Sequence, residues 1–73
     1  MHWNHRLIDM TAQNDGEHWL EIKEVFYEDD KPQGYASALV GGETASEVRE
    51  TLTRMLSALD NPVLTLTKEG ELK

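Results

Sequence analysis

The chain has 73 residues, enough for one small domain, and its 14 acidic and 7 basic residues give a formal charge of −7. So acidic a surface repels phosphates, which disfavours general binding to nucleic acid and to anionic membranes. The absence of cysteine excludes disulfides, thiol nucleophiles and thiolate metal ligands. The first residues lack the apolar core of a signal peptide and no apolar run is long enough to span a membrane, so we expect a cytoplasmic protein.

Residues 3–11 and 18–28 are predicted to form the first two strands, because both are rich in aromatic and β-branched residues. Asn14-Asp15-Gly16 between them suits a three-residue hairpin loop whose glycine adopts the left-handed conformation. This loop predicts a register in which apolar residues face apolar residues and a cation faces an anion. The predicted pairs are Met10 with Leu20, Ile8 with Ile22, and Arg6 with Glu24.

The predicted register divides the side chains of this hairpin between two faces. We expect the helix to cover the face that carries Ile8, Met10, Leu20, Ile22 and Phe26. The opposite face is too apolar for water, and aromatic residues with polar atoms are enriched at interfaces. It is therefore expected to contact a second copy or another protein, unless the sheet curls or loops and the tail cover it. The expected interface residues are Trp3, His5, Leu7, Trp19, Val25 and Tyr27.

An acidic segment that contains proline and glycine follows the second strand. Pro32 presets a turn dihedral and Gly34 tolerates the end of the turn, so residues 34–40 are expected to return as a third antiparallel strand. The acidic residues 28–30 could hold a weak divalent cation, but the alternating oxygen ligands of a calcium loop are missing. We expect a solvated turn there.

A capping box opens the predicted helix, because Thr44 can accept an orphan N–H while Glu47 reaches back to the cap. Apolar residues then recur at helical spacing to about Leu59, and Asp60-Asn61-Pro62 ends the helix. These residues form one predicted stripe: Ala45, Val48, Leu52, Met55, Leu56 and Leu59.

Residues 63–67 alternate β-branched and leucine residues and are predicted to form a last strand, before a flexible tail at residues 68–73. The expected fold class is α+β in the order β-β-β-α-β, and residues 1–67 form its single domain. An antiparallel three-stranded meander would carry one helix on one face, with the C-terminal strand added to it.

Patterns for catalysis and metal binding are weak. His2 and His5 would point to opposite faces of a strand, and His5 and His18 would lie far apart in the hairpin. No serine lies in a nucleophile-elbow pattern. The sequence therefore predicts no catalytic residues, no metal site and no cofactor.

Four short segments lie along the chain: Trp3-Asn4-His5-Arg6-Leu7-Ile8 at the start, Leu20-Glu21-Ile22-Lys23-Glu24-Val25-Phe26-Tyr27 in the second strand, the turn Lys31-Pro32-Gln33-Gly34-Tyr35, and Pro62-Val63-Leu64 after the helix. Together they resemble small bacterial proteins of unknown function that share a W-N-x-R-V/I start, an E-V-Y/F-Y strand and a helix that ends before Pro-Val/Ile-Leu. The resemblance implies a stand-alone bacterial domain and assigns no site residues.

The expected function is that of a small non-enzymatic protein-interaction module, homodimeric through the aromatic sheet face or through exchange of the last strand. One alternative is an acidic inhibitor or decoy that binds a basic groove on a nucleic-acid enzyme. It draws on residues 1–42, where eight acidic and three basic residues give a net charge of −5. A second alternative is a metal-dependent enzyme that uses histidines and carboxylates.

Overall fold

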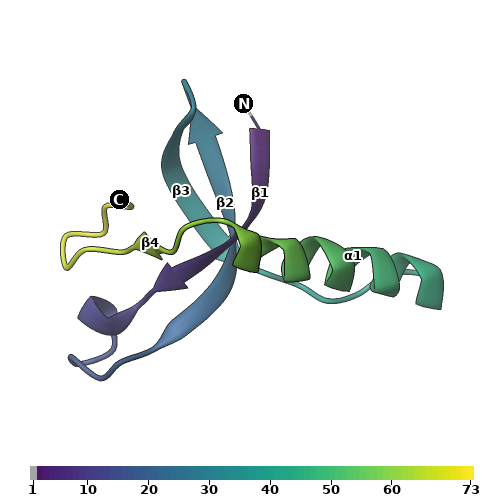
Figure 1. Ribbon diagram of the computed structural model, residues 1–73, viewed down its shortest axis with the longest axis horizontal. Helices are drawn as coiled ribbons and strands as arrows, with labels where there is room; N and C mark the ends of the chain where they lie inside the picture. The colour runs from purple at the N-terminus through teal and green to yellow at the C-terminus, as the bar shows by residue number, and fades with distance from the viewer. Residues whose placement is uncertain (1) are drawn as a thin grey trace.

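A computed structural model describes residues 2–73 and consists of a four-stranded sheet from which one helix projects (Figure 1). The strand order is β3-β2-β1-β4, with β1, β2 and β3 antiparallel and β4 parallel to β1. The α+β class is confirmed, but the sheet is mixed. The elements are β1 (His2–Asp9), η1 (Thr11–Gln13), β2 (Leu20–Glu28), β3 (Lys31–Ser37), α1 (Ala45–Ser57), η2 (Ala58–Asp60) and β4 (Leu64–Thr65).

Helix α1 begins with the predicted capping box. The Thr44 side chain accepts the backbone N–H of Glu47, and the Glu47 carboxylate accepts the N–H of Thr44 in return. The helix packs mainly against β1 and η2, and most of its length extends away from the sheet (Figure 1). The expectation that the helix lies across one sheet face is therefore wrong.

The register between β1 and β2 differs by one residue from the predicted one. Leu7 pairs with Ile22, and Arg6 pairs with Lys23. Because neighbouring residues of a strand point to opposite faces, this shift places Arg6 and Glu24 on opposite sides of the sheet. The predicted Arg6–Glu24 ion pair is wrong for that reason.

The register shift follows from a loop longer than the three residues predicted. The N–H of Met10 bonds to the carbonyl of Trp19 at 2.8 Å, and η1 lies inside the loop that this bond closes. Asp9 shapes the loop, because its carboxylate accepts both the backbone N–H and the hydroxyl of Thr11. Asp15 and Gly16 have positive φ values, as a tight turn requires, but they lie inside this longer loop and do not join the two strands directly.

The turn from β2 to β3 is tighter than predicted. Asp29 and Asp30 have φ values of 52° and 61°, the signs of a type I′ turn, and Glu28 pairs directly with Lys31. The third strand therefore starts before the expected residue 34. Pro32 is tolerated within it because β3 is an edge strand with a register shift at this point.

The hydrophobic core takes the side chains of β2 that were expected to face away from it. Val25 and Tyr27 are in the core, whereas Leu20, Ile22 and Phe26 were predicted to be. Ile8, Val25 and Tyr27 are buried there together with Leu64 and Leu66. The C-terminal residues cover this face. Leu66 bridges to Leu72, and Thr65 and Lys73 exchange backbone hydrogen bonds of 2.7 and 2.9 Å. Residues 68–73 were expected to be a flexible tail, but residues 71–73 pair with residues 65–67 and residues 68–70 form the turn between them. Met1, which falls in the predicted domain 1–67, lies outside the described residues.

Candidate functional site

The apolar side of α1 and η2 is wider than the part of it that packs against the sheet. At about 100° per residue, the arc from Leu56 round to Ala58 spans about 160° of the helix. The sheet side takes its smaller residues, since Thr51 is 8% exposed and Ala58 is fully buried. The expected stripe is therefore split, because Val48 and Met55 are half-buried while its three leucines face solvent.

Three solvent-facing leucines form a row along one side of α1 and the 3-10 turn η2 that continues it: Leu52 and Leu56 lie on α1, and Leu59 lies on η2. Leu52, Leu56 and Leu59 are 51%, 67% and 54% exposed, and we call them the leucine row. Their spacings of four and three residues are those of a coiled-coil seam. The row is about 10 Å long at 1.5 Å per residue. Because each leucine is already partly buried, covering its remaining exposed surface would contribute about 1–2 kcal/mol, so a partner here would gain free energy from all three.

The segment that leads into the helix is also apolar and exposed. Residues 38–44 carry the chain from the end of β3 to the far end of α1 (Figure 1). Within this segment Leu39 is 79% exposed and Val40 is more than half exposed. The projecting part of the molecule therefore adds apolar surface that its own core does not use.

The structure separates the six predicted interface residues. Val25 and Tyr27 lie on the core face beneath the C-terminal hairpin, and both are buried. Trp3, His5 and Leu7 lie on the opposite face of β1, as the alternation of a strand requires. The aromatic contact surface expected from the sequence is thus not formed, because the register shift moves the two strands' residues to different faces. For Val25 and Tyr27 the other expectation applies, since the C-terminal part of the chain covers these two residues.

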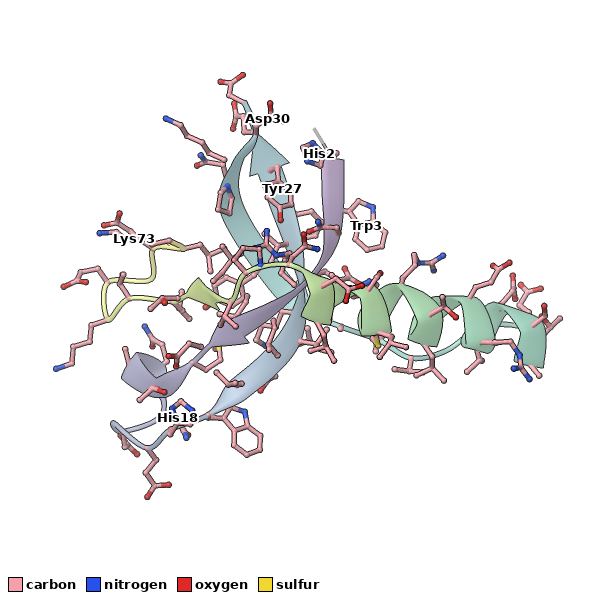
Figure 2. The ribbon with its side chains drawn as sticks, viewed as in Figure 1. His2, Trp3, His18, Tyr27, Asp30 and Lys73 are labelled. Atoms are coloured by element: carbon pink, nitrogen blue, oxygen red, sulfur yellow. The ribbon has the colours of Figure 1, made fainter. Side chains whose placement is uncertain are left out.

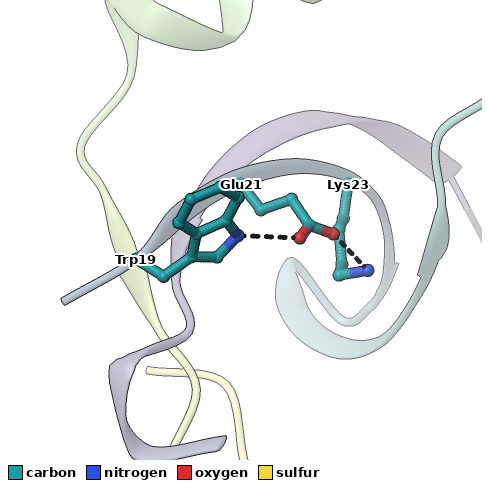
Figure 3. Close-up of polar contacts among 3 residues, drawn as sticks. All are labelled: Trp19, Glu21 and Lys23. Atoms are coloured by element: carbon teal, nitrogen blue, oxygen red, sulfur yellow. Dashed lines mark hydrogen bonds and ion pairs between the residues drawn. The ribbon is translucent and has the colours of Figure 1, made fainter. Parts of the chain in front are cut away.

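Of the predicted interface residues, only the two tryptophans are strongly exposed. Trp3 meets the buried His5 ring edge-on, with 5.4 Å between ring centroids. Trp19 precedes β2, and its indole N–H donates to the Glu21 carboxylate at 3.0 Å (Figure 3). Each indole is therefore held by a neighbour within the chain, although one side remains open.

Glu21 connects Trp19 to a cation on the same strand. Lys23 Nζ lies 2.7 Å from its carboxylate, and these hydrogen bonds from Lys23 and Trp19 lower the pKa of Glu21 below its ordinary value (Figure 3). The same ammonium lies 5.7 Å from the centre of the Tyr35 ring. This strip on the sheet surface satisfies its own charges and leaves no free group that points to a ligand.

The N-terminal motif has a structural role at the sheet centre. Arg6 Nη1 donates to the Tyr27 hydroxyl at 2.9 Å, and Nη2 donates to the carbonyl of Pro62 at 2.6 Å. The Tyr27 hydroxyl in turn donates to Asn4 Oδ1 at 2.8 Å, while His2 stacks on the ring (Figure 2). Arg6 therefore ties the segment after the helix to the β1–β2 pair, and the hydroxyl of Tyr27 is satisfied as both donor and acceptor.

The recess beside α1 brings few chemistry-bearing groups together. A recess of about 180 Å³ lies between the sheet and the end of α1, below the usual volume of small-molecule sites. His5 borders the recess, but its Nε2 is buried without a hydrogen-bond partner in the described chain and offers no surface to a ligand. Across residues 2–73, no three His, Asp or Glu side chains gather in a metal-binding arrangement.

The acidic residues do not form one continuous face. Glu21 and Glu24 lie on opposite faces of β2. Asp29 and Asp30 lie at one end of the hairpin and Glu17 lies in the loop at the other, so the nine-residue β2, about 30 Å long, separates them (Figure 2). A single basic groove would meet only part of this charge.

Nothing else about the described chain points to a known activity. In residues 2–73, no helix has the length and apolarity needed to cross a membrane. No protein-family model, curated protein or solved structure matches the chain. The resemblance to small bacterial proteins therefore stays a prediction.

Proposed function

We propose that the chain is a small, non-enzymatic protein-interaction module whose contact surface is the leucine row of α1 and η2. The observation that carries this proposal is the inverted burial of the helical segment made by α1 and η2, which buries Thr51 and Ala58 and exposes three leucines. A helix that only completed its own domain would turn its largest apolar side chains toward the core. Contiguous apolar surface that stays in water is typical of a binding site.

The overall dimensions support a contact made by the projecting helix. The radius of gyration is 12.9 Å, whereas a compact chain of this length has about 11 Å. An amphipathic helix that presents residues at i, i+4 and i+7 suits a helix-in-groove or helix-to-helix contact. The leucine row has this spacing, and it takes the place of the aromatic face as the proposed contact surface.

The two alternatives receive less support. An acidic decoy needs its carboxylates on one side, whereas Glu21 and Glu24 point to opposite faces. A metal-dependent enzyme needs convergent ligands, whereas His5 is buried beside the recess and His18 lies in the loop far from it (Figure 2). We therefore favour neither of them.

The proposal is tested by capture experiments with a matched pair of variants. Leu56→Asp places a charge in the leucine row, and Thr53→Asp places the same charge on an exposed position away from it. Immobilised wild type and Thr53→Asp should retain the same protein, either this chain itself or another one, while Leu56→Asp should lose it. If all three retain the same proteins, the leucine row is not the contact surface.

A further inference from the structure

We infer that the partner on the leucine row is a second copy of this chain, with the two α1 helices antiparallel about a two-fold axis. This inference rests on the proposed function, since it names the occupant of the same surface. It commits to self-association, whereas the proposed function would be met by any protein partner.

The exposed area of the chain matches what such a dimer needs. The chain exposes 5340 Å², while a folded monomer of 8.3 kDa exposes about 4,600 Å². The excess is about 750 Å², and a stable interface of standard size buries about 800 Å² on each partner. A second copy would bring the exposed area per chain close to that of an ordinary folded protein.

The small core points in the same direction. Within residues 2–73 six apolar residues are buried, and the chain has no cysteine for a disulfide. Chains of this size with a limited core are often stabilised by oligomerisation. The leucine row is an unused source of apolar contacts, and a symmetric contact uses it twice.

An antiparallel arrangement makes the row self-complementary. In a two-fold contact the same surface serves both partners, and residue i meets residue j while j meets i. If Leu52 meets Leu56 of the second copy, the helices cross near residue 54. The six leucines then form one apolar layer, and the projecting ends of the two helices point in opposite directions.

The charges at the two ends of the row fit this arrangement. Arg49 lies before the row and Asp60 directly follows it, and both are exposed. Within the described residues the ion pair present is Glu21–Lys23, so neither of these charges is paired in its own chain. Asp60 also lies at the end of the helix where the dipole disfavours an anion. The antiparallel crossing brings Arg49 level with Asp60 of the second copy, and this happens twice in the dimer.

The test is the oligomeric state of the wild type and a charge swap, measured by sedimentation equilibrium between about 1 and 100 μM. The wild type should have twice the monomer mass, and Leu56→Asp should be monomeric with unchanged helical circular dichroism. Arg49→Glu and Asp60→Arg should each weaken dimerisation about 2-fold to 30-fold, because two symmetric exposed pairs are lost. The double variant should recover most of the affinity.

The outcomes separate the two levels of the proposal. A wild type that stays monomeric at 100 μM overturns the dimer, and if it still captures another protein through the leucine row the proposed function stands. A dimer that Leu56→Asp leaves intact overturns both, because the contact then lies elsewhere. A double variant no better than the single ones overturns the antiparallel arrangement.

Discussion

Thr51 is 8% exposed and its neighbour Leu52 is 51% exposed, so α1 turns a threonine toward the sheet and a leucine toward solvent. The Thr51 hydroxyl tolerates burial because it donates to the carbonyl of Glu47 at 3.2 Å. Leu52 has no comparable use within the chain. This contrast between adjacent residues is the basis for assigning the outer side of α1 to a partner.

The first prediction concerns how stability depends on concentration. A dimer couples folding to association, so its melting temperature rises with protein concentration. We expect the wild type to melt at a higher temperature at 100 μM than at 1 μM. Leu56→Ala should weaken this dependence, and Leu56→Asp should remove it. Differential scanning fluorimetry or calorimetry over this range measures the effect, and Thr53→Asp is the matched control.

The second prediction concerns the hydroxyl of Tyr27. Tyr27→Phe leaves Asn4 Oδ1 without its donor and Arg6 Nη1 without its acceptor in a partly buried place. We expect the free energy of unfolding to fall by about 1–2 kcal/mol in urea denaturation. The control is Tyr35→Phe, because this exposed hydroxyl takes part in no hydrogen bond within the described residues. Equal losses in the two variants would show that the cluster around Tyr27 contributes nothing specific.

The third prediction concerns the capping box. Thr44→Ala removes the side chain that accepts the N–H of Glu47 and should lower the free energy of unfolding by about 1 kcal/mol. Thr44→Ser keeps the acceptor and should stay close to wild type. Most of α1 projects beyond the sheet, so the loss should also appear as fraying of the first turn in amide hydrogen exchange. An alanine variant with unchanged exchange would contradict this role.

The fourth prediction concerns acid. Hydrogen bonds from the hydroxyl and then the backbone N–H of Thr11 hold the pKa of Asp9 below its ordinary value. A carboxylate with a depressed folded pKa stabilises the fold at a pH above its unfolded pKa, and this stabilisation is lost as pH falls through the folded value. We expect the Asp9 contribution to start to fall below about pH 4, where an unperturbed aspartate takes up its proton, and to be lost below the folded pKa. Thr11→Val should move the NMR titration of Asp9 upward, and an unchanged titration would rule out this cause.

Much of the fold follows from local sequence signals. Thr44 and Glu47 define the start of the helix, and the β-branched and aromatic content of residues 18–28 defines the central strand. The order of the three antiparallel strands also follows from chain order and turns. Each of these features depends on residues close together in sequence.

The features that the sequence did not reveal depend on contacts between distant residues. The β1–β2 register depends on how Asp9 and Thr11 close the loop, and a change of one residue exchanges the faces. The covering of Val25 and Tyr27 depends on a hairpin at the opposite end of the chain. Because the predicted register was wrong by one residue, the predicted contact surface included Val25 and Tyr27, which belong to the hydrophobic core.

The leucine row was present in the sequence as part of one apolar stripe. Periodicity locates the centre of such a stripe, but it cannot tell which edge of a broad arc the sheet will cover. The sequence did contain one sign of this, because the apolar side of the helix is wider than one sheet contact needs. Thr51 and Ala58 extend it on one side, and small residues of this kind allow a close approach to β1.

Disulfide trapping tests the central claim most directly, because the chain has no cysteine of its own. Leu52→Cys and Leu56→Cys are prepared separately and then mixed under mild oxidation. In the antiparallel dimer position 52 of one copy lies against position 56 of the other. The mixture should therefore form a disulfide-linked heterodimer much faster than either variant alone forms a homodimer. Equal cross-linking in the mixture and in the separate variants, or none at all, would contradict self-association through the leucine row.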